Sequence, residues 1–282
     1  MIQTNKSFEF MGYPVAYHEA GSGQPMLMLH NGGCSHIIWK NQIEYFQQDY
    51  RVIAFDLLGF GDSGRPEFPF TLEVYVDMLA SFIQQEKLEG PILFGNCIGG
   101  AISLQYALDN PHIPKALILT NICGGISMMK YFHPFMFPNS HATYPRWLYS
   151  SLFNVSAFNW VKKKVLHRLY GPKPNEESLV FQRLLEGLHH PKQPQSRLWL
   201  IEGLTTFSKF DHFQDDPSEL PPLQVFWGKE NKVLPLHRGE LLMAKLQPQA
   251  CHIYPEAGHL LMAEKAESFN QDVSHFLRQY AS

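Results

Sequence analysis

The sequence has little that would place it in a membrane, outside the cell or on nucleic acid. No stretch reaches ~18 uninterrupted apolar residues, so no membrane-spanning helix is expected. The segment MIQTNKSFEFMGYPVAYHEAG lacks the basic start and apolar centre of a signal peptide. A formal net charge of −3 gives no basic surface for nucleic acid or anionic lipid. We therefore expect a cytoplasmic protein with neither nucleic acid nor membrane as a partner.

Cysteine is also scarce, and its spacing fits no metal site. The four cysteines (Cys34, Cys97, Cys123 and Cys251) form no paired metal-ligand pattern and no secreted disulfide framework. In a reducing compartment they remain free thiols. We expect neither a metal nor an organic cofactor. Apolar residues, by contrast, make up 45% of the chain and charged residues only 17%, which is enough to bury a large core.

Strand-like and helix-like runs alternate through the first part of the chain. Short apolar runs at 25–30, 51–59, 91–96 and 114–121 are separated by segments with helical periodicity at 37–48, 71–88 and 98–110. Two earlier runs, 8–12 and 14–21, predict a hairpin joined near Gly12. Such alternation favours an α/β fold in which helices cover both faces of a mainly parallel sheet.

The character of the sequence changes between Ile122 and about Pro194. This stretch is dense in Phe, Tyr, Trp and Met, with prolines between helix-like pieces and no strand-like run. We predict that residues 1–121 and 195–282 form one α/β core, and that residues 122–194 form an inserted helical cap. Most of the aromatic residues fit packing within the cap. Phe135 and Trp147 are candidates for the wall of a substrate pocket.

The strongest local signal is GNCIGG at residues 95–100. An apolar run ends there and a helix-like run begins, which suits a nucleophile on a tight strand-to-helix turn. Gly95 and Gly99 supply the small neighbours that such a turn needs. The helix that follows points its N-terminus at Cys97 and favours negative charge there. A buried structural cysteine in a glycine-rich turn is the alternative.

Two further stretches fit the same site. LHNGGCSHIIW, at 29–39, is a glycine-rich loop that directly follows a strand-like run, so it can aim a backbone N–H at the same point as the N–H of Ile98. YPEAGHLLMAEKAESF, at 254–269, places His259 in a loop after a strand, where sites form in open α/β sheets.

In their order and spacing, HNGG, DLLGFGDSGRP, GNCIGG, FWGKENKVLP and AGH resemble the α/β-hydrolase fold superfamily, in its type with a cap between strands six and seven. The resemblance covers nearly the whole chain. It implies that Cys97 is the nucleophile and His259 the base, with the amides of Gly32 and Ile98 forming the oxyanion hole.

Two residues depart from that family's pattern. The usual serine is Cys97, and the acid of the WGxxDxxxP pattern is Asn231. A Cys–His–Asn set makes chemical sense because a thiol can lose its proton before attack, so a neutral amide oxygen of Asn231 that orients the His259 ring is enough. Glu230 is the alternative third member, through a one-residue shift of its loop, and Asn121 occupies the place where some relatives carry another acid. A single Ser-to-Cys change would explain Cys97 but not Asn231.

These residues predict an enzyme that forms an acyl-Cys97 thioester. We expect a small-molecule ester, thioester or lactone with an apolar or aromatic acyl part, and hydrolysis as the reaction. Acyl transfer to a second substrate is the alternative, with the substrate then carried as a thioester. A non-catalytic binding protein on the same scaffold is a further alternative, although the retained Cys97 and His259 favour catalysis. The acyl group, the acceptor and the oligomeric state stay open.

Overall fold

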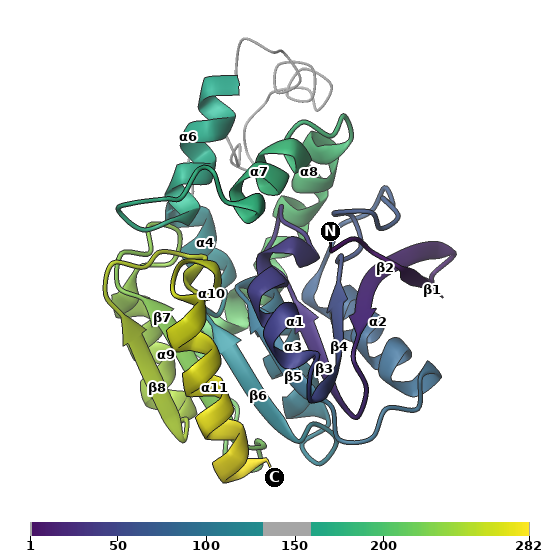
Figure 1. The fold of residues 1–282 in the computed structure, drawn as a ribbon, viewed down its shortest axis with the longest axis vertical. Helices are drawn as coiled ribbons and strands as arrows, with labels where there is room; N and C mark the ends of the chain where they lie inside the picture. The colour runs from purple at the N-terminus through teal and green to yellow at the C-terminus, as the bar shows by residue number, and fades with distance from the viewer. Residues whose placement is uncertain (1, 132–158, 282) are drawn as a thin grey trace.

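The strands form one eight-stranded sheet in the order β1-β2-β4-β3-β5-β6-β7-β8 (Figure 1). The computed structural model describes residues 2–131 and 159–281. The strands are β1 (Lys6–Phe10), β2 (Tyr13–Ala20), β3 (Gln24–Leu29), β4 (Tyr50–Phe55), β5 (Ile92–Asn96), β6 (Ala116–Thr120), β7 (Leu223–Gly228) and β8 (Ala250–Tyr254).

The pairing of the strands confirms the predicted α/β class. Strands β1 and β2 form an antiparallel hairpin, β2 also pairs antiparallel with β4, and every other neighbouring pair is parallel. Every residue of β5, β6 and β7 is buried, because helices cover both faces of the sheet there. The carboxyl ends of the parallel strands therefore meet at one edge.

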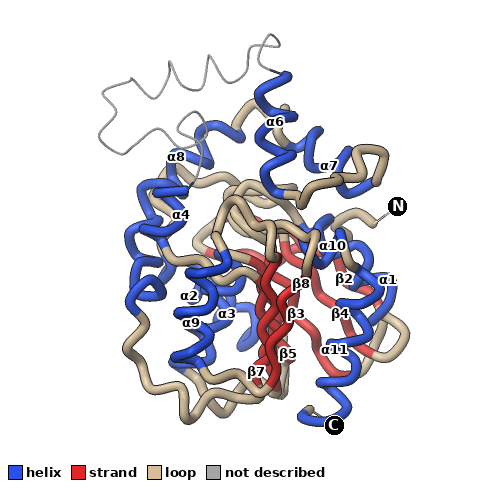
Figure 2. The backbone as a smooth tube through the Cα atoms, turned by 90° about the vertical axis from the view of Figure 1, so that its left-hand side faces the viewer, coloured by secondary structure: helices blue, strands red, loops and turns tan. Residues whose placement is uncertain are grey.

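Helices pack on both sides of the sheet (Figure 2). One side carries α1 (Lys40–Phe46) and α11 (Ala266–Tyr280), and the other carries α2 (Leu72–Gln85), α3 (Ile98–Asp109) and α9 (Leu236–Leu246). The start of α2 lies where the sequence predicts it, because the Thr71 side chain accepts a hydrogen bond from the Val74 N–H. Two short helices, η1 (His36–Trp39) and α10 (Leu261–Glu264), contact α1 on its side of the sheet.

The described residues between β6 and β7 form helices joined by loops and contain no strand. They form α4 (Gly125–Tyr131), α6 (Asn159–Leu169), α7 (Leu179–Gly187), α8 (Gln193–Gly203) and η3 (Leu204–His212). Helices α6 and α7 lie above the carboxyl ends of the strands (Figure 1). The predicted boundary at residue 194 falls inside α8, and the division into core and cap stays a prediction. Phe135 and Trp147 lie outside the described residues.

None of the helices within residues 2–131 and 159–281 is both long and apolar enough to cross a membrane.

Candidate active site

Cys97 sits on the turn between β5 and α3 in a backbone conformation that non-glycine residues rarely adopt. Its φ is 57° and its ψ is −111°. The turn is held from both sides, since the Cys97 N–H donates to the Thr120 carbonyl and the Cys97 carbonyl accepts from the N–H groups of Ala101 and Cys123. A strained conformation fixed in this way is typical of functional turns.

The flanking glycines allow the close backbone approach that this turn needs. A Cβ on Gly95 would lie 2.3 Å from the Gly99 carbonyl oxygen, and a Cβ on Gly99 would lie 2.2 Å from the Leu29 carbonyl oxygen. Both distances are far inside van der Waals contact. The glycine pattern in the sequence therefore has a steric cause on both sides of Cys97.

His259 is anchored through its backbone and presents its ring to Cys97. Its N–H donates to the Leu169 carbonyl at 2.8 Å, and its own carbonyl accepts from the side-chain amides of Asn96 and Asn121. The ring is within hydrogen-bonding reach of the Cys97 sulfur. Asn121, which follows β6, thus holds the backbone of His259 and does not contact the ring nitrogen as a third triad member would.

Asn231 approaches the other side of the His259 ring with its amide nitrogen. The Asn231 Nδ2 lies 3.1 Å from the His259 Nδ1. The Asn231 Oδ1 is already occupied, because it accepts from the N–H groups of Val233 and Leu234, both at 2.9 Å. These two backbone donors fix which end of the amide faces the ring. Asn231 is therefore a donor to His259 and not an acceptor from it.

Glu230 does not take that place. Its side chain is exposed, whereas Asn231 is only 5% exposed. Among the described residues the contacts of Glu230 include a backbone hydrogen bond to the Ala257 carbonyl and none to His259. The structure thus brings Cys97, His259 and Asn231 together and leaves Glu230 at the surface.

The loop after β3 lies beside the Cys97 turn. A Cβ on Gly32 would come within 3.6 Å of the Ile98 Cδ1, so the two residues expected to supply the oxyanion hole are neighbours. His30, at the start of this loop, holds it to the loop after β4, because the His30 Nε2 accepts a hydrogen bond from the Leu57 N–H at 2.9 Å. Burial lowers the pKa of His30 to about 4, so its ring is neutral at physiological pH. Gln193 of α8 holds the loop from the other side by donating to the Gly33 carbonyl.

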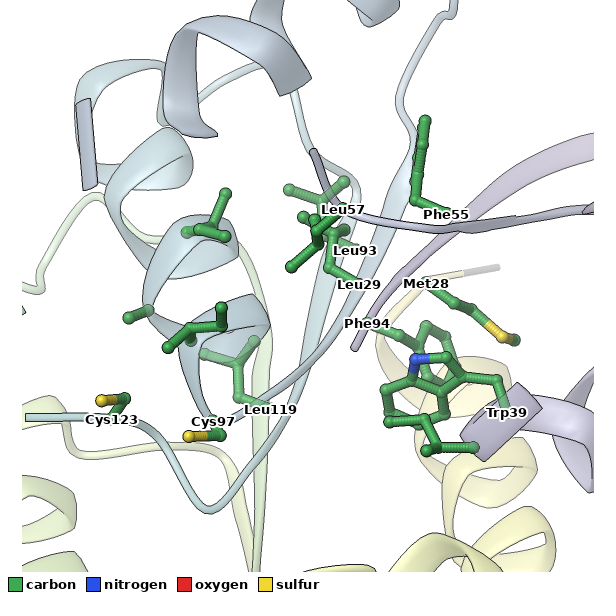
Figure 3. Packing of buried hydrophobic residues seen from close by; sticks show 14 of the residues in the cluster. Met28, Leu29, Trp39, Phe55, Leu57, Leu93, Phe94, Cys97, Leu119 and Cys123 are labelled. Carbon is green, nitrogen blue, oxygen red and sulfur yellow. The ribbon is translucent and has the colours of Figure 1, made fainter. Parts of the chain in front are cut away.

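Cys97 is fully buried, and its surroundings favour a thiolate. Burial alone would raise the pKa of the Cys97 thiol. The nearby Cys123 thiol, the His259 ring and the N–H of Ile98 outweigh that effect and lower the pKa of Cys97 below that of a free cysteine. The Cys123 Sγ also lies 3.4 Å from the Met128 Sδ, which is a second acceptor for its proton. Figure 3 shows Cys97 and Cys123 near Leu119 within the buried cluster. Cys123 is thus a third contact of the reactive sulfur.

The other thiols are the less acidic ones. Burial raises the pKa of Cys34 to about 12, and it also raises the pKa of Cys251. The pKa of Cys123 lies well above the usual value, because its hydrogen bond to Cys97 and its burial both favour the neutral thiol. Cys97 is therefore the thiol that a cysteine-directed reagent should modify first once it gains access.

We expect the Cys123 thiol to influence how fast Cys97 is alkylated at acid pH, on the acid limb of the pH–rate profile. In Cys123→Ala the alkylation of Cys97 by iodoacetamide should slow about tenfold on the acid limb, the scale of a ~1.5 kcal/mol hydrogen bond to a charged group. Cys123→Ser keeps an O–H donor and should stay close to the wild type. The measurement is the pH dependence of the alkylation rate, with the labelled residue identified by peptide mass. An acid limb of the pH–rate profile that is the same in Cys123→Ala, in Cys123→Ser and in the wild type would contradict this role for Cys123.

A narrow cavity lies between the Gly32 loop and the helices above it. It has a volume of about 20 Å³, room for little more than one water molecule. Its wall contains Arg197 and is otherwise mainly apolar, with five leucines: Leu166, Leu169, Leu184, Leu188 and Leu200. The Cys97 side chain is fully buried and is not part of this wall.

Several supporting residues carry no signal in the sequence. Glu264 is one, since its carboxylate accepts from the N–H of Gly258 at 2.9 Å and from the N–H of Gly171 at 2.6 Å. It thereby ties the His259 loop to the segment after α6. Asn96, Cys123 and Gln193 are others. Their roles depend on contacts between segments that lie far apart in the chain, whereas motifs found by pattern, such as HNGG and GNCIGG, are each local.

No group of three or more His, Cys, Asp or Glu side chains that could hold a metal ion occurs in the part of the chain that the structure describes. The reactive cluster consists instead of a thiol, an imidazole and an amide, placed after β5, β8 and β7. A mainly parallel sheet with an antiparallel second strand, helices inserted after β6 and a reactive cluster at the carboxyl edge defines the α/β-hydrolase class of proteins.

Comparison with known proteins agrees with that class. The family described as alpha/beta hydrolase fold matches residues 24–266, and the chain belongs to it. A similar curated protein is the 2-hydroxy-6-oxo-6-(2'-aminophenyl)hexa-2,4-dienoic acid hydrolase of Metapseudomonas resinovorans, 26% identical over 279 residues that cover 96% of this chain and 89% of the relative.

Two solved structures share the fold over nearly the whole chain. A thermophilic esterase from Thermogutta terrifontis superposes with a TM-score of 0.77 at 20% identity, covering 98% of this chain and 97% of that one. The meta-cleavage product hydrolase of Pseudomonas fluorescens IP01 superposes with a TM-score of 0.76 at 21% identity, covering 98% of each chain.

Proposed function

We propose that the protein is an enzyme that forms an acyl thioester on Cys97 and then releases the acyl group, with hydrolysis as its reaction. The observation that carries this proposal is the contact of the Cys97 sulfur with His259, whose other ring nitrogen is held by Asn231. A nucleophile that contacts an imidazole, with a third residue that orients the imidazole, is the arrangement typical of covalent catalysis. The names of the curated relatives, which are hydrolases, support release to water.

The proposed first step is attack of the Cys97 thiolate on a substrate carbonyl carbon. The tetrahedral oxyanion would be held by the N–H groups of Ile98 and Gly32, which are neighbours in the fold. Because Ile98 begins α3, the helix N-terminus adds a favourable field for the negative charge. Collapse of the oxyanion expels the leaving group and leaves the acyl group on sulfur.

The acyl part of the substrate should be apolar. The leucines of the cavity wall would contact it, and they outnumber the polar groups there. Phe135 and Trp147 remain proposed additions to this wall. The substrate class is therefore an ester, thioester or lactone with an apolar or aromatic acyl chain, and no metal or organic cofactor is needed for these steps.

Acyl transfer is the second candidate, and the orientation of Asn231 favours it. An amide N–H facing the His259 Nδ1 leaves the ring proton on Nε2, the nitrogen that would have to accept a proton from water. Release of the acyl group to water is then slow, and release to another nucleophile can compete.

The test is the intact mass of the protein after incubation with acetyl, octanoyl and benzoyl thioesters and esters. We expect an acyl adduct on Cys97 that is absent in Cys97→Ala, with octanoyl and benzoyl donors reacting at least ~10-fold faster than acetyl donors, the scale of ~1.4 kcal/mol from partial burial of the acyl chain. The rate at which the acyl adduct on Cys97 is lost in buffer, with and without an added thiol or amine, separates hydrolysis from acyl transfer.

Leu179, the first residue of α7, and Leu188, which directly follows that helix, give a matched control for the acyl site. Leu188 lines the cavity, whereas Leu179 is 37% exposed and lies outside it. Leu188→Asp should abolish the preference for octanoyl over acetyl donors, and Leu179→Asp should preserve it. If no donor acylates Cys97 while the ligands still bind, the protein is a binding protein and the proposed enzyme is wrong.

A further inference from the structure

We propose that the acyl donor of this site is a thioester, because the His259 ring is held in a form that cannot hand a proton to a leaving group. This inference rests on the proposed acyl-Cys97 chemistry and narrows its substrate class. It comes from the direction of one side-chain amide, that of Asn231.

The Asn231 amide cannot easily turn over. Its Oδ1 accepts from the N–H groups of Val233 and Leu234, and all three residues are at least nine-tenths buried. Turning the amide would point its NH₂ group at both N–H groups and leave two buried donors without an acceptor, which is costly in a protein interior. The Nδ2 group therefore stays 3.1 Å from the His259 Nδ1 and donates to it.

An Nδ1 that accepts a hydrogen bond carries no proton, so the neutral ring carries its one proton on Nε2. A second proton, on Nδ1, would lie directly against the amide protons of Asn231. The ring can thus donate a hydrogen bond to the Cys97 thiolate. It has no spare proton to give to a leaving group, and it cannot take one up at Nε2.

Thioester exchange needs no such proton. The Cys97 thiolate attacks R–CO–SR′, the tetrahedral intermediate forms, and its collapse gives R–CO–S–Cys97 and R′S⁻. One C–S bond forms, one breaks, and the negative charge passes from one sulfur to the other. An oxygen ester would instead have to expel an alkoxide, a far stronger base than a thiolate, without a proton donor.

The same geometry bears on the second step. A thiolate acceptor attacks the acyl-Cys97 carbonyl and takes the acyl group by the reverse exchange, which releases the Cys97 thiolate and again moves no proton. Water must lose a proton as it attacks, and Nε2 is already protonated. The acyl-Cys97 intermediate should therefore be released faster by a thiol than by water, so this inference favours acyl transfer, the second candidate, over hydrolysis.

The experiment compares two donors of one acyl group, the octanoyl thioester of N-acetylcysteamine and octanoyl ethyl ester. The rate of acylation of Cys97 is followed by intact mass and divided by the rate of each donor with a free small thiol. We expect the wild type to favour the thioester by about 10²-fold or more beyond that reference, the scale of a missing general acid. Asn231→Asp, which can still accept from Val233 and Leu234, should raise the ester rate by a similar factor and the thioester rate far less.

A second readout reports the ring directly. In protein labelled with ¹⁵N-histidine, with His259→Gln used to assign the signal, the wild-type Nδ1 should be unprotonated at neutral pH and the Asn231→Asp Nδ1 protonated. Equal preference for both donors, or a protonated Nδ1 in the wild type, overturns this inference while leaving acyl-Cys97 intact. Absence of any Cys97 adduct with either donor instead overturns the proposed function, and this inference with it.

Discussion

Replacing Cys97 by serine should lower kcat at least ~10³-fold with an acyl substrate that the wild type turns over. A serine hydroxyl stays protonated at neutral pH and must lose its proton during attack. The only ring nitrogen that faces residue 97 already carries a proton, because Asn231 donates to the other one. Steady-state kinetics with one acyl donor measures the loss of kcat, and a far-UV CD spectrum checks that the variant folds.

The second substitution should repair part of that loss. In Cys97→Ser with Asn231→Asp, a carboxylate accepts the Nδ1 proton and stabilises the imidazolium that forms, so we expect recovery of about 10–100-fold. Asn231→Asp alone should give little gain with a thioester donor, because added negative charge disfavours the Cys97 thiolate. The double-mutant cycle measures this coupling. Strictly additive effects would return Asn231 to the status of an ordinary turn residue.

Glu230→Gln is the matched control for this series. The Glu230 side chain is exposed and lies outside the contacts of His259. The substitution should leave kcat within about twofold, as surface changes away from a site generally do. A larger loss than in Asn231→Ala would instead assign the third position to Glu230.

The fold could be predicted from the sequence because its signals are local. Alternating apolar runs and helical periods fix a mainly parallel sheet, and the hairpin of β1 and β2 follows from the turn at Gly12. Cys97 directly follows β5 and His259 lies in the loop after β8, so parallel pairing brings them to one edge. The same reasoning places Asn231 after β7, at the same edge, where it meets His259.

The direction of the Asn231 amide could not be predicted in this way. It depends on which atom the N–H groups of Val233 and Leu234 meet, and that is a matter of side-chain rotation within one loop. The sequence predicts a neutral oxygen facing His259, whereas the structure places the nitrogen there. The contact of Cys123 with Cys97 is similar, since it joins the ends of β5 and β6 through side chains that no periodicity describes.

Gly99→Ala should strongly damage the scaffold of the site. The new Cβ would lie 2.2 Å from the Leu29 carbonyl oxygen and 2.8 Å from that of His30, and these are backbone atoms that no side-chain rotation can move away. We expect the free energy of unfolding to fall by about 3 kcal/mol, at the upper end of overpacking effects, and Tm to fall by roughly 10 °C.

Gly187→Ala is the matched control, because a Cβ there meets nothing within 4 Å. Gly187 ends α7, so alanine should leave Tm unchanged or raise it slightly. The folded fraction of the Gly99→Ala protein should also have a lower kcat. Leu29 and His30 lead directly into the Gly32 loop, so their displacement moves that loop away from Ile98. Thermal unfolding and kinetics at a temperature where both variants are folded separate the two effects. A Gly99→Ala protein as stable and as active as Gly187→Ala would mean that the loop and the Cys97 turn do not need their close approach.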